Sequence, residues 1–397
     1  MKLKIYDDSK NYTGQIICLR NVQKLEGLDN LVGASIQGNL ALIAKDYPLD
    51  TLYVYFPSGC VLSDDFLKLN NLYKEETLNK DIKKKGFFEH TRRTKAVKFR
   101  GHKSCAFLCP LSFLAEIGVD TAYLKEGDEF NEIDGINVCQ KYIMPVKGSA
   151  SQKAKNKLID GRVENIHFKE HFDTDHLLKY IHTLNLDKFV ITIKLHGTSF
   201  RVGRTLVKRK LSLLERFSKF FGVKVQEVEF DYVIGSHHCV KSIGFKELTN
   251  NNHFYETDLW SASCEEYFKG KLNKGECIYG ELVGLTYEGK EIQKNYSYGF
   301  TKPTPFIYRI TNVNEDGVEI DLTFSQLTAR ANELGIQTVP FIFSGSIKDY
   351  AKKYQLNDCL NNIEFGEDLV ERFLEKKSIF DKKIIEEGIV LSLQKYP

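Results

Sequence analysis

The stretch Ile191–Phe200, ITIKLHGTSF, places a lysine at the end of a short β-branched run and follows it at once with a His-Gly-Thr turn. A lysine on a strand is ordinarily a solvated residue, so Lys194 is first interpreted as an exposed side chain. Gly197 has no side chain and would let a ligand or another backbone approach closely. The alternative interpretation is therefore a lysine that the strand holds in a binding site.

Two carboxylates occupy a comparable setting further along the chain. Glu281 lies in CIYGELVGL between apolar neighbours, and Glu387 precedes a glycine in IIEEGIVLSL. Strand alternation could leave either carboxylate on the solvent face of its sheet. Buried charges, however, are costly unless they are paired or bound to a metal ion. One lysine and two carboxylates on sheet-like segments would satisfy one another around a shared site.

The length and charge of the chain allow several classes of partner. Its 397 residues exceed one ordinary domain, and 56 basic against 53 acidic residues leave a net charge of +3. This balance neither requires nor excludes nucleic acid, because a local basic groove can lie on a near-neutral protein. No apolar run approaches the ~20 residues of a membrane span, and the first residues lack the apolar core of a signal peptide. We expect a cytoplasmic monomer with no membrane partner.

The cysteine pattern favours reduced thiols over disulfides or metal ligands. Nine cysteines are scattered along the chain, several of them inside apolar runs, and no CxxC pair is present. A reduced cysteine in such a run behaves as a small apolar residue. The run His237-His238-Cys239 has no second ligand pair at a zinc-like spacing, so structural zinc is not expected.

The pattern along the chain predicts an α+β fold in two parts. Residues 1–145 contain short β-prone runs with one intervening helical segment, which suggests an OB-like β-barrel domain. Residues 146–170 are polar and weakly patterned, and we interpret them as a linker. Residues 171–397 alternate strands, such as KFVITIK and ECIYGELVGL, with helices, such as FSQLTARANELG and EDLVERFLEKKSIFD. The basic stretch 80–95 could track phosphates, although a solvated connection is the plainer interpretation.

Three of these segments together resemble a known superfamily. KLHGTSF, IYGELVG and EEGIVL are similar to motifs I, III and IV of the covalent nucleotidyltransferases, which include the polynucleotide ligases and the mRNA capping enzymes. The histidine of KLHGT resembles the ATP-dependent RNA ligases, since DNA ligases and capping enzymes usually carry aspartate there. KAVKFRGHKSCAFLCPLSFL is similar to a segment of the RNA ligases with an N-terminal OB-type domain, with Ala106 in place of a glycine. The resemblance makes residues 171–397 an adenylyltransferase domain of antiparallel sheets with flanking helices.

The resemblance implies an RNA ligase that uses ATP for RNA repair or end sealing. Lys194 would attack the α-phosphate of ATP, release pyrophosphate and hold AMP through a phosphoramide bond. AMP would then pass to an RNA 5′-phosphate, and a 3′-hydroxyl would displace it. Attack requires the neutral amine, so the lysine pKa must fall from its usual ~10.4 or the proton must leave on approach. Mg²⁺ (or Mn²⁺) bound by Glu281 and Glu387 would assist.

The resemblance also assigns contacts with the nucleotide. These residues are His196, Gly197, Thr198, Ser236, Glu281 and Tyr308. Tyr308 matches the aromatic of motif IIIa that stacks on adenine, although a core strand aromatic explains the sequence equally well. Arg309 follows it where the family often has aspartate. His237 stands where an arginine of motif Ia commonly holds phosphate, and Lys241 is the candidate substitute.

Two departures keep other interpretations open. Ile193 precedes the lysine where related RNA ligases often have glutamate, and motif V, a strand with paired lysines for the ATP phosphates, is not visible after Glu387. Another segment or polypeptide could supply that strand, or self-adenylylation could be weak. The alternatives are a catalytically impaired or inactive RNA-binding homologue and another polynucleotide ligase or capping-type enzyme. The histidine of KLHGT argues against the latter.

Overall fold

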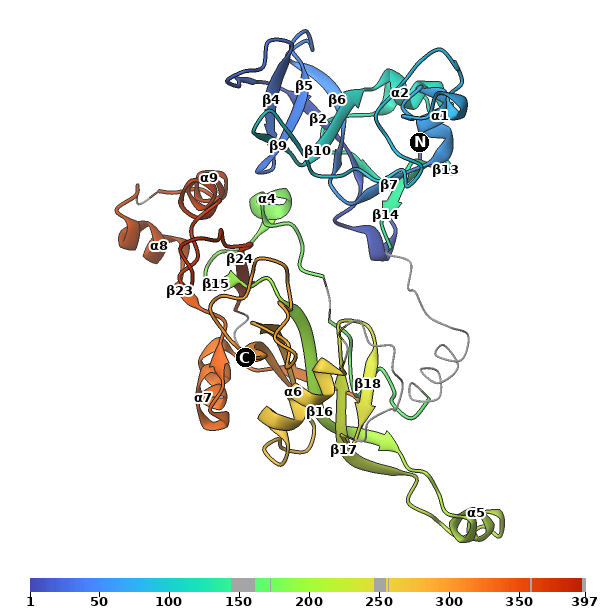
Figure 1. Cartoon of the computed structure of the whole chain (residues 1–397), viewed down its shortest axis with the longest axis vertical. Coiled ribbons are helices and arrows are strands. Elements are labelled where there is room, and N and C mark those ends of the chain that lie inside the picture. The colour runs from blue at the N-terminus through green and yellow to red at the C-terminus, as the bar shows by residue number, and fades with distance from the viewer. Residues whose placement is uncertain (144–160, 172, 246–254, 256, 358, 395–397) are drawn as a thin grey trace. The chain divides into compact units, whose positions relative to one another are not determined.

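The computed structural model describes residues 1–143, 161–171, 173–245, 255, 257–357 and 359–394. Contacts within the chain divide it into two compact units (Figure 1). The first comprises Met1–Val146 and Asp175–Tyr180, and the second comprises Lys147–Thr174 and Ile181–Pro397. Of the predicted linker, residues 146–160 lie outside the described residues.

The first unit consists mainly of short antiparallel strands. These are β1 (Leu3–Lys4), β2 (Gly14–Leu19), β3 (Gln23–Lys24), β4 (Leu31–Ile36), β5 (Asn39–Ala44), β6 (Thr51–Pro57), β7 (Cys60–Leu62), β8 (Val97–Phe99), β9 (His102–Ser104), β10 (Ala106–Pro110), β11 (Glu129–Phe130), β12 (Glu132–Ile133), β13 (Ile136–Asn137) and β14 (Cys139–Lys141). Its helices are α1 (Asp64–Leu69), α2 (Ser112–Glu116), α4 (Leu177–Tyr180) and the 3₁₀ turns η1 (Asp7–Ser9), η2 (Glu76–Leu78) and η3 (Thr121–Tyr123).

The strands of the first unit pair in several separate sheets. The largest has the order β10-β6-β2-β11, and the others are β3-β4-β5, β1-β12-β13, β7-β14 and β8-β9. Within the part of the chain that the structure describes, these pairings do not close into a ring. The β-rich character expected of this region is therefore observed, whereas a closed barrel is not.

The core of the first unit forms where α1 covers the central sheet. Ser63 caps α1, because its hydroxyl accepts the Phe66 N–H at 3.2 Å. The ring of Phe66 is fully buried and meets Phe56 of β6 edge to face, with ring centroids 5.5 Å apart. This arrangement suits the quadrupoles of the two rings.

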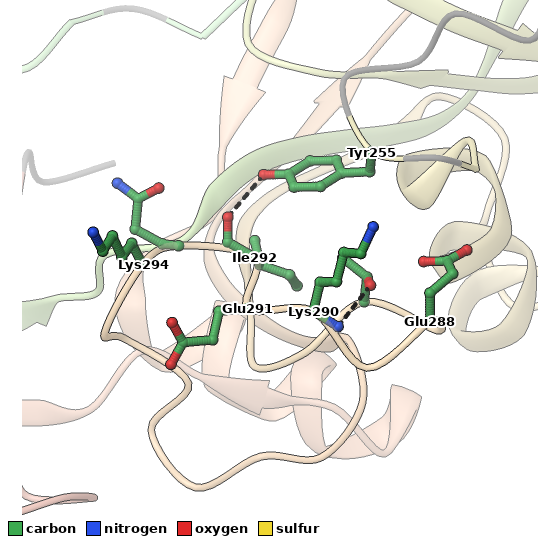
Figure 2. A pocket seen from close by; sticks show the side chains of 8 residues that line it. Tyr255, Glu288, Lys290, Glu291, Ile292 and Lys294 are labelled. Atoms are coloured by element: carbon green, nitrogen blue, oxygen red, sulfur yellow. Dashed lines mark hydrogen bonds between the residues drawn. The ribbon is translucent and has the colours of Figure 1, made fainter.

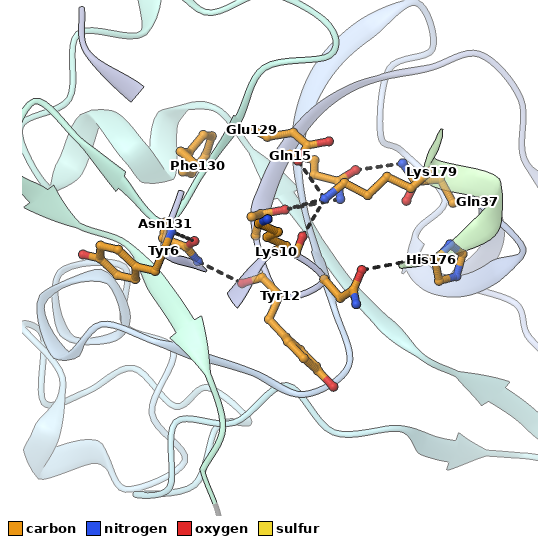
Figure 3. A network of polar contacts seen from close by, with 12 residues as sticks. Tyr6, Lys10, Tyr12, Gln15, Gln37, Glu129, Phe130, Asn131, His176 and Lys179 are labelled. Carbon is orange, nitrogen blue, oxygen red and sulfur yellow. Dashed lines mark hydrogen bonds and ion pairs between the residues drawn. The ribbon is translucent and has the colours of Figure 1, made fainter. Parts of the chain in front are cut away.

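A buried lysine attaches α4 to the first unit. Lys179 Nζ donates to the Lys10 carbonyl at 2.8 Å and to Thr13 Oγ1 at 3.1 Å, and it pairs with Glu129 at 2.7 Å (Figure 3). Nearby, Asn131 Oδ1 accepts the Tyr6 N–H at 2.9 Å. A buried ammonium with this many partners is satisfied, and removal of any one of them would leave a costly charge. Residues 175–180 therefore pack with the first unit.

The second unit combines two sheets with flanking helices. Its strands are β15 (Phe189–Lys194), β16 (Thr198–Lys208), β17 (Val228–Gly235), β18 (Val240–Ile243), β19 (Glu276–Val283), β20 (Thr304–Val313), β21 (Glu319–Asp321), β22 (Gln337–Thr338), β23 (Phe341–Gly345) and β24 (Gly388–Leu393). Its helices are η4 (Ile181–Thr183), α5 (Leu213–Phe220), α6 (Leu259–Phe268), α7 (Phe324–Leu334), α8 (Ile347–Tyr354) and α9 (Asn362–Phe373).

The large sheet of the second unit has the order β18-β17-β16-β19-β20-β21, and β22 adds to β20 in parallel. The small sheet has the order β23-β15-β24 and is antiparallel. Phe200 of β16 packs against Phe268 of α6 in the core of the large sheet, with centroids 5.6 Å apart. The expected mixed fold of mostly antiparallel sheets is thus confirmed. No helix among the described residues is long and apolar enough to cross a membrane.

Candidate active site

The motif I segment crosses from one sheet of the second unit to the other. β15 ends at Lys194 in the small sheet, and β16 begins at Thr198 in the large sheet. The five residues of β15 before Lys194 are buried, whereas Lys194 is exposed. The apolar run therefore anchors the strand in the core, and only its last residue is exposed.

Strand register brings the three charged residues of the sequence prediction together. Lys194 on β15 pairs with Gly388 on β24, so Glu387 is the residue just before that pair. Ser199 on β16 pairs with Glu281 on β19. Only three residues separate β15 from β16, and both carboxylates contact this short segment: Glu387 contacts Lys194, and Glu281 contacts Gly197.

Lys194 and Glu387 form a direct ion pair. Lys194 Nζ lies 2.7 Å from Glu387 Oε1, and His196 Nδ1 lies 3.6 Å from Glu387 Oε2. Burial opposes ionisation of Glu387, but the hydrogen bonds and charges of His196 and Lys194 outweigh it and lower the pKa of this carboxyl. Glu387 is thus a carboxylate, and Lys194 is held as its ammonium partner.

Glu281 is held differently, by two donors of the turn that it faces. Its Oε1 accepts the Gly197 N–H at 3.1 Å, and its Oε2 accepts the Ser199 hydroxyl at 3.1 Å. Burial raises the pKa of Glu281 to about 8; the negative charge of Glu387 adds to this effect, and the two donors only partly offset it. A cation bound beside this buried carboxyl group would compensate its negative charge.

The turn glycine packs closely against a neighbouring strand. A Cβ atom on Gly197 would lie 2.1 Å from the Leu282 carbonyl oxygen of β19. The sequence predicted that this glycine would let a ligand or another backbone approach closely. The structure shows the close backbone approach, because the glycine lets the turn lie next to the strand that carries Glu281.

His196 has partners that the sequence did not indicate. Gln293 Nε2 lies 2.6 Å from His196 Nε2, and the His196 N–H donates to the Tyr298 hydroxyl at 2.9 Å. These contacts, together with the approach of Nδ1 to Glu387, hold the His196 ring beside the carboxylate. Gln293 and Tyr298 lie in the connection between β19 and β20, which carries no motif that could have indicated them.

That connection lines a pocket of about 400 Å³ beside the turn (Figure 2). The pocket is lined by Tyr255, Thr286, Glu288, Lys290, Glu291, Ile292, Gln293 and Lys294. Tyr255 closes one side by donating to the Ile292 carbonyl at 3.1 Å. Gln293 lines this pocket and also contacts His196, so the pocket adjoins the predicted nucleotide site.

Tyr308 lies in a β-bulge of β20. Tyr279 pairs with Arg309 and Gly280 with Ile307, so Tyr308 has no opposite residue. Its hydroxyl lies 2.7 Å from Nδ1 of His171. Burial raises the pKa of the phenol, and the charge of Glu281 adds to it. Burial also lowers the pKa of His171 to about 3, with the charges of His237 and Arg201 adding, so this ring is neutral.

The remaining predicted positions lie further from the ion pair. Ser236 follows β17, where its N–H donates to the Cys239 carbonyl at 2.9 Å, and no contact found in the described chain joins it to Lys194. Arg309 is engaged by Asp321 at 2.5 Å and Glu319 at 3.3 Å on β21. Lys241 lies over the ring of Trp260, 4.5 Å from its centroid.

Trp260 connects Lys241 to the start of β16. Its indole N–H donates to the Ser199 carbonyl at 3.0 Å. Lys241 is thereby held near the strand that follows the turn, whereas the ring of His237 stacks on His171 at 5.1 Å. The motif Ia position at which the family commonly has arginine is therefore occupied by the imidazole ring of His237. Lys241 lies on β18, the strand next to β17.

The acidic groups suit a hard divalent cation. Among the described residues, no group of three or more histidine, cysteine or acidic side chains is arranged so that it could hold a metal ion by itself. Mg²⁺ commonly uses only one or two carboxylates and takes its other ligands from water and substrate phosphates. Glu281 and Glu387 meet that requirement, because both carboxyl groups contact residues of the motif I segment.

A lysine on a strand end, two acidic strand residues beside it and antiparallel sheets of this order define a nucleotidyltransferase-type architecture. The RNA ligase family model matches residues 187–395, more than half of the chain. The chain therefore belongs to the RNA ligase family, as the motifs indicated. No curated protein matches it.

Solved structures of Naegleria gruberi RNA ligase share the fold. The form with PPi is 15% identical, with 96% of this chain and 93% of that chain covered and a TM-score of 0.57. A lysine-to-alanine mutant with ATP and Mn is 16% identical, with coverages of 97% and 94% and a TM-score of 0.55. A lysine-to-methionine mutant with AMP and Mn is 14% identical, with coverages of 96% and 93% and a TM-score of 0.57.

Proposed function

We propose that this chain is an ATP-dependent RNA ligase that seals RNA ends through an AMP group carried on Lys194. The observation that supports the proposal best is the convergence of Lys194, Glu281 and Glu387 at one turn by strand register. Membership of the RNA ligase family agrees with it. The similar Naegleria gruberi structures contain ATP, AMP, PPi and Mn, which supports ATP and a divalent metal as cofactors here.

Lys194 is the proposed nucleophile. A bond would form between Nζ and the α-phosphorus of ATP while the bond from that phosphorus to the bridging oxygen breaks and pyrophosphate leaves. The lysine is an ammonium in its ion pair with Glu387, 2.7 Å away, so one proton must leave before Nζ can attack. Glu387 is the proposed acceptor of that proton, and its negative charge holds Lys194 beside it.

Glu281 and Glu387 are the proposed metal ligands, with Mg²⁺ or Mn²⁺ as the ion. Such an ion neutralises phosphate charge and lowers the pKa of a nearby amine. The hydrogen bonds from Gly197 and Ser199 fix the direction of the Glu281 carboxyl group. Because its pKa is about 8, cation binding would compete with a proton on this carboxyl at neutral pH.

The remaining nucleotide contacts are proposed for residues around the same turn. His196 and Gly197 belong to that turn, Thr198 follows it, and Tyr308 lies in the β-bulge of β20. Ser236 and Lys241 lie at the β17–β18 end, where phosphate binding is the proposed role. Gln293 and Tyr298 are added as positioning residues for His196.

The wider organisation is proposed as follows. Residues 1–145 form an OB-like domain, residues 146–170 a linker and residues 171–397 the nucleotidyltransferase domain. The substrate is RNA with a 5′-phosphate and a 3′-hydroxyl, and the protein acts as a cytoplasmic monomer in RNA repair. The β-rich first unit and family membership support the RNA-directed part of this proposal.

A sealing assay tests the function. The protein is incubated with ATP, Mn²⁺ and a single-stranded RNA that carries a 5′-phosphate, beside the same RNA with a 5′-hydroxyl and a DNA of equal sequence. Circular or joined RNA only from the 5′-phosphate RNA is expected. Sealing of DNA in preference to RNA would favour a DNA ligase, and failure to seal pre-adenylylated RNA would favour an inactive homologue.

A further inference from the structure

The hairpin formed by β16 and β17 carries α5 away from the body of its sheet (Figure 1). The two strands pair from Arg201 and Gly235 to Lys208 and Val228, and α5 lies in the connection beyond the last pair. Ser212 begins the helix with a capping box: its hydroxyl accepts the Glu215 N–H at 3.3 Å, and Glu215 Oε2 accepts the Ser212 N–H at 2.8 Å. The sequence therefore specifies a helix at this tip.

One face of α5 is apolar and exposed to solvent. Its members are Leu213, Leu214, Phe217, Phe220 and the C-cap Phe221, whose exposed fractions range from 64% to 83%. At about 100° per residue they fall within an arc of about 120°, the width of the stripe that a surface helix normally buries. No residue of α5 is buried.

The helix is too short to be stable by itself. An isolated helix below ~12–15 residues is marginal in water, and α5 has 8. In other helices of this unit, such as α6 and α7, buried apolar residues supply the missing stability. A partner that covers the apolar face of α5 would supply this stability.

The flanks of α5 are basic. Residues 208–224 contain six lysines and arginines and one acidic residue. That residue, Glu215, is occupied by the cap and by Arg209 at 2.9 Å, and Lys219 pairs with Glu227 at 2.7 Å. The side chains of Lys210, Arg216 and Lys224 have no acidic partner among the described residues. The surface that α5 offers is therefore apolar with a cationic border.

We propose that α5 and its flanks dock on the surface of an anionic lipid bilayer. The helix would lie in the plane of the interface, with its leucines and phenylalanines at the boundary of headgroups and acyl chains and its basic side chains toward the phosphates. This combination of Phe and Leu on one face with Lys and Arg around it is typical of interfacial helices. Basic residues close to such a surface are attracted by its negative potential.

Other occupants fit the observations less well. Single-stranded RNA stacks on open ring faces, whereas Phe217 and Phe220 both contact Phe221 edge to face, with centroids 4.7 and 5.4 Å away. A second copy of the chain would bring two cationic tips together. The expectation of no membrane partner rested on the lack of a spanning run, and a surface helix needs only one amphipathic face.

Vesicle flotation tests the proposal independently of ligase activity. The full chain is mixed with vesicles of phosphatidylcholine alone or of phosphatidylcholine with phosphatidylserine, and the floating fraction is measured. The variants are Phe217→Ser/Phe220→Ser and Arg216→Gln/Lys224→Gln. The matched control is Ile82→Ser/Phe87→Ser, which changes two apolar side chains of the first unit that are 67% and 62% exposed. Thermal unfolding checks that each variant folds.

The wild type is expected to float with the anionic vesicles. The phenylalanine variant should lose about tenfold or more of this affinity, the charge variant should lose the preference for phosphatidylserine, and the control should match the wild type. Failure of the wild type to float, or equal flotation of the phenylalanine variant, would overturn the proposal. So would a result in which the phenylalanine variant alters RNA affinity or oligomeric mass while flotation is unchanged.

Discussion

The substitution Glu281→Gln should make the metal-free protein more stable at alkaline pH while it removes metal binding. Burial moves the pKa of this carboxyl from 4.5 to about 8 in the folded chain. A folded pKa that is raised contributes stability below pH 4.5, and this contribution is lost as the pH rises through about 8. Above that pH the folded wild type must hold a buried anion.

The magnitude follows from the same shift. A pKa that moves from 4.5 to about 8 corresponds to at most about 5 kcal/mol. The glutamine amide oxygen can keep only part of the contacts with Gly197 and Ser199, and its NH₂ group needs a new partner. We therefore expect a net gain of about 1–3 kcal/mol at pH 9, or several °C in Tm at about 2–4 °C per kcal/mol.

Thermal unfolding from pH 5 to pH 9 measures this effect, with Glu291→Gln as the control on an exposed carboxyl of the β19–β20 connection. The Tm difference between Glu281→Gln and the wild type should grow with pH up to about pH 8 and then level off. Mn²⁺ should raise the Tm of the wild type and not that of the variant. A Tm difference that is independent of pH would refute the account of Glu281 given above.

Three further substitutions test the turn and its surroundings. Gln293→Ala removes the 2.6 Å contact with His196. Pre-steady-state adenylylation should then slow by about tenfold with little change in Tm. An unchanged rate would show that Gln293 does not position His196. Tyr308→Ala should raise the KM for ATP by about tenfold, as expected for loss of base stacking, and Tyr308→Phe should restore it; equal effects would point to the hydroxyl instead. Gly197→Ala places a Cβ 2.1 Å from the Leu282 carbonyl oxygen. Urea denaturation should show a loss of about 2 kcal/mol or more in the free energy of unfolding. An unchanged free energy of unfolding would contradict the close packing.

The strands around the site could be predicted because their sequence pattern is strong. KFVITIK, ECIYGELVGL and IIEEGIVLSL correspond to β15, β19 and β24, since each is an apolar run bounded by glycine or charge. FSQLTARANELG corresponds to α7, with Thr323 as cap and Gly335 as terminator at φ 71°. EDLVERFLEKKSIFD overlaps α9, which begins earlier because Asn361 caps it.

Other features could not be predicted because they depend on long-range packing. The sequence does not reveal that β15 and β24 share a small sheet, which is what brings Glu387 to Lys194. Gln293 and Tyr298 come from a connection without a motif. The helix α5 was missed although Ser212 and Glu215 form a capping-box pattern, because its eight residues are too few to show a clear helical period. The particular backbone that approaches Gly197, at Leu282 of β19, is also known only from the fold.

Transfer of label from ATP to the protein tests the central claim most directly. The chain is incubated with Mn²⁺ and ATP labelled on the α-phosphate, beside Lys194→Ala and the control Lys188→Ala just before β15. We expect labelled protein from the wild type and the control, none from Lys194→Ala, and none with labelled GTP. Label on Lys194→Ala, or no label on the wild type together with failure to seal pre-adenylylated RNA, would contradict the assignment of Lys194 as the residue that carries AMP.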